Sequence, residues 1–296
     1  MLRLTDGMSE WWFRAGLEYP TVAVFAFFAV FVFGSCLGSF LNVCIWRLPL
    51  GESVVTAPSH CTKCGYEIRW YDNIPIVSYL VLRGRCRCCR EPYSCRYLVV
   101  EALTGVLFVL AFVKVGLADQ PICTVFPYWA MILLAVAASW IDAEHRLIPD
   151  ALTIPAMCFG VAVSAVCPSV WGIESRLYAP VYALISGAIP ALFLALFAII
   201  GKKLTRKEVL GWGDVTFIAA VGMLLGLPAA FFAVAAGSLA GTFYGIGVAA
   251  VLKRPVARVK IAFGPFLAGA ALVWLFAGEK ILRWYLVHGV HLPPAP

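Results

Sequence analysis

Two aspartates stand where apolar segments of the chain meet polar loops. Asp142 follows an apolar run at 124–141, and Asp214 ends a Gly-Trp-Gly-Asp motif in front of another apolar run. Two carboxylates brought together can share one proton, so that the ionised one activates water while the protonated one polarises a peptide carbonyl. Asp142 and Asp214 are therefore candidates for the catalytic pair of an aspartic peptidase, and a transporter that uses two acids at the membrane is an equal alternative from these residues alone. We also expect Gly211 and Gly213 to let an extended substrate backbone approach Asp214.

Helix capping is the ordinary explanation for an acidic residue at such a boundary. Asp214 is well placed to cap the helix that follows it, and Asp150, which follows Pro149, is predicted to cap the next helix along the chain. Asp142 does not fit this explanation, because it ends a helix, where a negative charge opposes the helix dipole. Its position therefore favours a functional role.

Four cysteines form a second candidate site. They stand as two CxxC pairs separated by twenty-one residues, Cys61 with Cys64 and Cys86 with Cys89. Two such pairs bind tetrahedral zinc through four thiolates and leave no position for water, so we expect a structural zinc site. Disulfides and free thiols are the alternatives. Cys88 and Cys95 are possible substitute ligands, but Cys86 with Cys89 has the regular spacing.

The elements that must position these residues are membrane helices. The chain of 296 residues is 62% hydrophobic and 13% charged, whereas soluble domains are about 45–50% apolar and about 25% charged. This composition excludes a disordered chain, a collagen, a coiled coil and a small disulfide-bonded secreted domain. We predict an all-α polytopic membrane protein with a zinc-binding loop between its first two spans.

About eight segments are apolar and long enough to be predicted as transmembrane helices. The first carries Gly34, Gly38 and Ser39, small residues that let another helix pack closely. The predicted spans are Val22–Trp46, Leu98–Leu117, Thr124–Ile141, Ala151–Val166, Val181–Ile200, a short one from Val215 to about Gly226, one ending near Leu252, and Phe263–Leu286.

The basic residues predict the orientation of these spans. Seventeen of the 23 lie in four loops, 47–97, 142–150, 201–213 and 253–262, which are therefore expected to face the cytoplasm. The net charge of +7 is then an orientation signal, and no nucleic-acid partner is expected. The predicted organisation is an extracytoplasmic segment (1–21), a first transmembrane helix (22–46), a cytoplasmic zinc-binding domain (47–97) and a helical membrane peptidase domain (98–296).

Motifs spread over residues 34–268 resemble those of bacterial prepilin peptidases, which are membrane aspartic peptidases of the GxGD type. The resemblance is carried by the segments 38–49, 59–61, 68–75, 78–80, 82–86, 96–97, 148–150, 211–214 and 263–268, together with Cys64, Cys89, Ser94, Glu101 and Asp142.

The resemblance implies an enzyme of the bacterial inner membrane that cuts the leader from type IV prepilins and pseudopilins on the cytoplasmic side. Members with the cysteine loop also methylate the new amino terminus with S-adenosylmethionine. The family's catalytic pair corresponds to Asp142 and Asp214, and its zinc ligands correspond to the two CxxC pairs. No GxGxxG motif follows a predicted strand, so the sequence does not identify the residues that bind S-adenosylmethionine.

Two other functions are compatible with parts of this sequence. A proton- or cation-coupled transporter would use the two aspartates as a relay, but it predicts acids deep within spans and an internal repeat. A zinc-loop scaffold without catalysis would not need two aspartates at matched depth. The sequence favours the peptidase.

Overall fold

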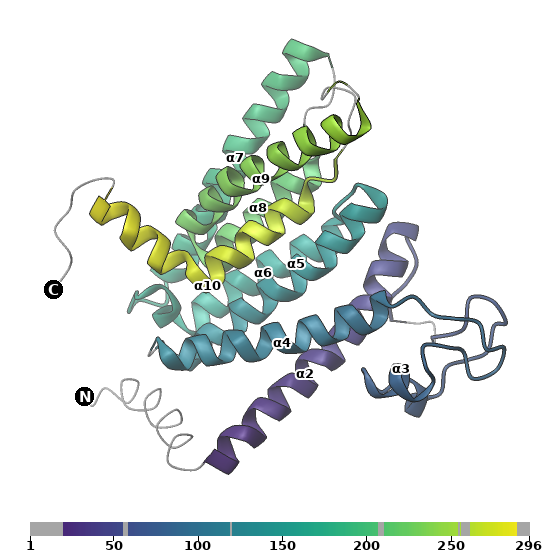
Figure 1. Ribbon diagram of the computed structural model, residues 1–296. Coiled ribbons are helices and arrows are strands. Elements are labelled where there is room, and N and C mark those ends of the chain that lie inside the picture. The colour runs from purple at the N-terminus through teal and green to yellow at the C-terminus, as the bar shows by residue number, and fades with distance from the viewer. Residues whose placement is uncertain are drawn as a thin grey trace. The chain divides into compact units, whose positions relative to one another are not determined.

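The computed structural model describes residues 20–55, 59–118, 120–206, 210–253, 255 and 261–288 (Figure 1). These residues form helices and loops without a β-strand, apart from two isolated bridges. The chain divides into two compact units, Met1–Ile141 and Asp142–Pro296. The predicted segment 1–21 lies almost wholly outside the described residues, and the predicted cytoplasmic loop domain falls within the first unit.

In the first unit, α2 (Pro20–Arg47) crosses α4 (Arg96–Leu117), as Figure 1 shows. Glycines make this crossing close: a Cβ added at Gly34 would lie 2.9 Å from Phe108 Cβ, and one at Gly38 would lie 2.9 Å from Glu101 Cα. The predicted packing role of these two glycines is confirmed. The remaining helices are α5 (Val125–His145), whose last turn belongs to the second unit, and the short α3 (Val77–Val81) in the loop domain.

The second unit is built around α8 (Trp212–Leu225), which packs against α6, α7, α9 and α10. Most of its side chains are buried, as expected for a helix that is apolar on all sides. Gly222 allows α8 to meet α7, because an added methyl would collide with the Ser186 carbonyl group. The neighbouring helices are α6 (Asp150–Val166), α7 (Tyr178–Thr205), α9 (Leu227–Leu252) and α10 (Gly264–His288).

All eight predicted segments are helices, which confirms the fold class, but two of them are short. Six are long and apolar enough to cross a membrane. The other two are α6, with 17 residues, and α8, with 14. At about 1.5 Å per residue α8 extends only about 21 Å, less than the hydrocarbon core of about 30 Å. It ends at Gly226, whose φ of +91° stops the helix.

Candidate active site and metal centre

In the second unit, Asp142 lies against the N-terminus of α10, a different helix from its own. The helix α5 does not end at Ile141 as predicted but continues to His145, so Asp142 lies in its last turn and is only 6% exposed. The backbone N–H of Gly264, the first residue of α10, donates to Asp142 Oδ2 at 2.7 Å. The positive end of the α10 dipole therefore offsets the unfavourable position of this carboxylate in α5.

Gly264 has a role at the site that was not predicted from the sequence. A Cβ at this position would lie 2.9 Å from Asp142 Oδ2 and 3.0 Å from Asp142 Cβ, so only glycine lets the carboxylate reach the N–H group. The contact joins residues 122 positions apart, which no local pattern predicts. The only signal in the sequence was the 263–268 motif.

Asp214 is in the first turn of α8 rather than at its cap. The cap position is occupied by Gly211, whose N–H donates to Asp214 Oδ2 at 3.3 Å. This is the position at which an acidic side chain reaches back to the capping residue. Asp214 is half-buried, and its carboxylate lies within electrostatic range of Asp142. The structure thus brings the two predicted aspartates together within one unit.

The two glycines before Asp214 have different surroundings. A Cβ at Gly213 would lie 2.7 Å from the Ile148 carbonyl oxygen and 2.9 Å from Ile148 Cβ. The absence of a side chain at Gly213 therefore lets the loop after α5 pack closely against α8. Gly211 is exposed, and the only neighbour of a Cβ there is Asp214 Oδ2 at 3.3 Å. Packing therefore accounts for Gly213, while the approach of substrate to either glycine stays a prediction.

The predicted cap at Asp150 is wrong. Pro149 occupies the cap position of α6 without a side-chain hydrogen bond, and Asp150 is the first residue of the helix. Its Oδ1 accepts a hydrogen bond from the Thr216 hydroxyl at 3.2 Å. Asp150 therefore ties α6 to α8.

The four predicted cysteine ligands form a cluster in the first unit. Their Sγ atoms all lie within 4.8 Å of one another, with Cys61 3.8 Å from Cys89 and Cys64 3.9 Å from Cys86. Zinc–sulfur bonds of about 2.3 Å at the tetrahedral angle place sulfurs about 3.8 Å apart, so the cluster fits a tetrahedral metal ion. The spacing is well beyond a disulfide bond of about 2.05 Å. The possible substitutes Cys88 and Cys95 do not belong to the cluster.

The two CxxC turns have the same backbone geometry. The Gly65 N–H donates to the Cys61 carbonyl oxygen at 2.9 Å, and the Arg90 N–H donates to the Cys86 carbonyl oxygen at 3.1 Å. Gly65 and Arg90 both have a positive φ, of +69° and +62°. Glycine adopts a positive φ readily, and the repeat of the turn at Arg90 shows that this geometry does not require glycine.

Hydrogen bonds to Cys86 favour its thiolate form. Burial disfavours the charged thiolate, but the backbone N–H groups of Cys89 and Cys88 and the Tyr93 hydroxyl stabilise it and lower the pKa of Cys86 to about 6. Metal ions bind the thiolate and not the thiol. Cys86 is therefore prepared for metal, whereas at Cys64 and Cys89 backbone hydrogen bonds are outweighed by burial and by the neighbouring thiols, which raise the pKa of both.

These features define a polytopic helical membrane protein with a carboxylate pair in one unit and a four-cysteine centre in the other. Residues 32–115 match the bacterial peptidase A24 N-terminal domain, and residues 129–246 match the type IV leader peptidase family. The chain belongs to this type IV leader peptidase family. No solved structure matches it.

Several relatives are named prepilin leader peptidase/N-methyltransferase. The chain is 34% identical to the one from Aeromonas hydrophila over 288 residues, which cover 88% of this chain and 94% of the relative. It is 32% identical to the one from Xanthomonas campestris pv. campestris, and the match covers 92% of this chain and 95% of the relative. It is 36% identical to the one from Myxococcus xanthus, and the match covers 77% of this chain and 63% of the relative. These matches do not support a transporter.

Proposed function

We propose that this chain cleaves the leader from type IV prepilins and pseudopilins and then methylates the new amino terminus. The observation that carries the proposal is the Asp142–Asp214 pair, in which each carboxylate accepts a hydrogen bond from a backbone N–H group, that of Gly264 for Asp142 and that of Gly211 for Asp214. The chain's family and the names of its relatives support the same activity.

The two carboxylates divide the work of peptide hydrolysis. One takes a proton from water as the water oxygen attacks the carbonyl carbon, and the other, protonated, donates a hydrogen bond to the carbonyl oxygen. The carbon–nitrogen bond then breaks, and the leaving amine takes up a proton from a carboxyl group. Backbone N–H groups fix the two side chains, so the pair needs little reorganisation during the reaction.

The basic loops support a site that faces the cytoplasm in the bacterial inner membrane. The end of α5 and the start of α8 adjoin the loops 142–150 and 201–213, whose basic residues favour the cytoplasmic side. A substrate with a basic leader enters from this side.

Zinc and S-adenosylmethionine are the two proposed cofactors. Zinc would join the two CxxC turns through Cys61, Cys64, Cys86 and Cys89 and so hold the loop domain together. S-adenosylmethionine, when bound, supplies the methyl group. Because all four ligands come from the protein, the metal has a structural role and no step of peptide hydrolysis passes through it.

The direct test uses the purified full-length protein and a synthetic prepilin peptide, with and without S-adenosylmethionine. Mass spectrometry is expected to show loss of the leader in both reactions, and addition of one methyl group to the mature peptide only when the donor is present. An intact peptide in both reactions would overturn the proposal.

Metal analysis is expected to find about one zinc per chain, because four thiolates saturate a tetrahedral ion. Cys86→Ser is expected to lose the zinc, while the matched change Cys88→Ser retains it, since Cys88 lies outside the cluster. Methylation is expected to fall with the zinc content, and cleavage is expected to fall less, because both aspartates belong to the other unit. Equal metal content in the two variants would contradict the ligand assignment.

A further inference from the structure

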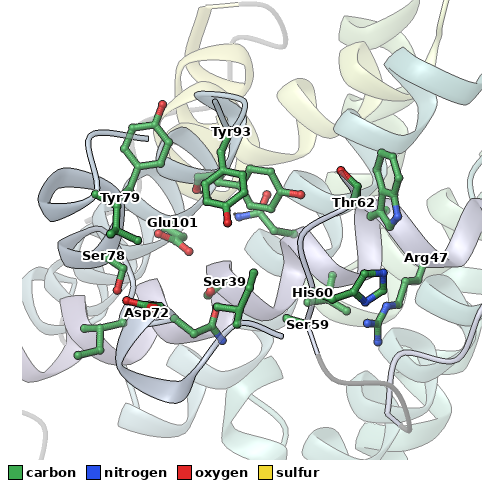
Figure 2. Close-up of a pocket in the computed structure, with 18 of the residues that line it drawn as sticks. Ser39, Arg47, Ser59, His60, Thr62, Asp72, Ser78, Tyr79, Tyr93 and Glu101 are labelled. Atoms are coloured by element: carbon green, nitrogen blue, oxygen red, sulfur yellow. Dashed lines mark hydrogen bonds between the residues drawn. The ribbon is translucent and has the colours of Figure 1, made fainter. Parts of the chain in front are cut away.

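The first unit contains a cavity that the peptidase reaction does not use. Its volume is about 420 Å³, within the range of about 300–1,000 Å³ that is typical of small-molecule sites. The cavity lies between the end of α2, the start of α4 and the loop domain, and Figure 2 shows Ser39, Tyr93 and Glu101 around it. All of its lining residues lie between 39 and 101, so it belongs to the first unit alone.

Glu101 places a buried carboxyl group in the wall of this cavity, which the buried Arg47 also lines. The residue is 7% exposed, its Oε2 accepts a hydrogen bond from the Ile76 N–H at 2.8 Å, and Ser39 is a second hydrogen-bond partner. Among the described residues no basic side chain pairs with Glu101. A buried carboxylate without a counter-ion is unfavourable, and a bound cation removes that cost.

Asn42 adds an unsatisfied acceptor to the same cavity. It is 2% exposed, and its Nδ2 donates to the carbonyl oxygen of Tyr97 at 3.2 Å, so the orientation of the amide is fixed. Its Oδ1 is buried and has no donor within the part of the chain that the structure describes. A buried acceptor without a partner is unusual and marks a position for a donor from a ligand.

Aromatic rings complete the lining. Trp46, Tyr79, Tyr93 and Tyr97 contribute to the wall, and the rings of Tyr93 and Tyr97 have centroids 6.3 Å apart. Aromatic faces attract cations that carry alkyl groups. The cavity therefore suits a ligand that is both organic and positively charged.

We infer that this cavity is the methyl-transfer site, which binds the sulfonium methyl donor and receives the new amino terminus beside Glu101 and Asn42. The inference rests on the proposed methyltransferase function. It explains the chemistry of the lining, since both reactants are cations: the donor carries a sulfonium, and the amine is protonated in water. These residues come from three separate segments, so no local sequence pattern identifies them.

The side chains of the cavity have defined tasks in the transfer. The Glu101 carboxylate accepts a proton from the terminal ammonium, which leaves a neutral amine. The amine nitrogen gives its lone pair to the methyl carbon, the carbon–sulfur bond breaks, and its electron pair remains on sulfur, which becomes a neutral thioether. The methylated nitrogen is then a positively charged ammonium, and the proton on Glu101 returns to water.

Binding of S-adenosylmethionine to the purified protein, measured by isothermal titration calorimetry, tests the site apart from turnover. Glu101→Gln is expected to weaken this binding at least about tenfold, because it removes the charge at nearly constant volume. The matched control Glu67→Gln changes an exposed carboxylate outside the cavity and is expected to bind like the wild type. Zinc content and leader cleavage report whether each variant is folded.

A second measurement needs no variant. Ultraviolet cross-linking of radiolabelled S-adenosylmethionine to the wild-type protein is expected to label peptides that contain residues 39–47, 59–82 or 93–101. Labelling confined to residues 142–296 would overturn the site, and so would unchanged binding of S-adenosylmethionine by a folded Glu101→Gln variant. If the wild type still methylates in either case, the proposed function stands. A wild type that neither binds the donor nor methylates would overturn the methyltransferase function and the site together.

Discussion

Asp142→Asn and Asp214→Asn are each expected to reduce the rate of leader cleavage by at least about 10²- to 10⁴-fold, because each removes one partner of the acid–base pair. Asparagine keeps the size of the side chain and an oxygen that accepts the N–H of Gly264 or Gly211. The variants should therefore keep the fold and lose the chemistry. The measurement is the rate of appearance of mature peptide by mass spectrometry.

Asp150→Asn is the matched control for these two variants. Asp150 lies at the start of α6 in the same unit, and the Thr216 hydroxyl can still donate to the amide oxygen after the change. We expect this variant to retain most of its cleavage activity. Methylation of a peptide that already has a free amino terminus should persist in all three variants, since it depends on the other unit. Cleavage at the wild-type rate by Asp142→Asn or Asp214→Asn would exclude the assigned pair.

Local features of this chain were predictable from its sequence. Hydropathy identifies the eight apolar helices of the described residues, because each apolar segment is continuous and ends at charged or helix-breaking residues. The spacing of Cys61, Cys64, Cys86 and Cys89 identifies the metal cluster, because each CxxC turn is a short structure formed by its own residues. In both cases the information lies within a few residues of the feature.

Contacts between distant segments were not predictable. The predicted span ended at Ile141 because the apolar run ends there. The helix continues through Asp142 because α10, from another part of the sequence, places its N-terminus on that carboxylate. For the same reason Glu101 was recognised only as one residue of a motif. Its cavity exists only where α2, α4 and the loop domain meet.

A contact between distant segments also determines the loss of leader cleavage that we expect for Gly213→Ala. The new Cβ would lie 2.7 Å from the carbonyl oxygen of Ile148 and 3.1 Å from its backbone nitrogen. These are backbone atoms that cannot rotate away, so the first turn of α8 must shift. Asp214 is the next residue and moves with it. A displacement of about 1 Å can cost a catalytic pair about 10²-fold in rate, and we expect a loss of that order in leader cleavage.

Two matched changes separate packing at Gly213 from the approach of substrate. Gly247→Ala adds the same methyl group in α9, where no atom lies within 4 Å, and is expected to leave cleavage unchanged. At Gly211 only the movable Asp214 side chain is near, so packing predicts a much smaller loss for Gly211→Ala than for Gly213→Ala. If instead the substrate must approach both glycines, Gly211→Ala is expected to lose as much cleavage activity as Gly213→Ala and to raise KM. Equal losses in kcat/KM would therefore contradict the packing explanation, because only Gly213 has backbone in the space that a methyl group would occupy.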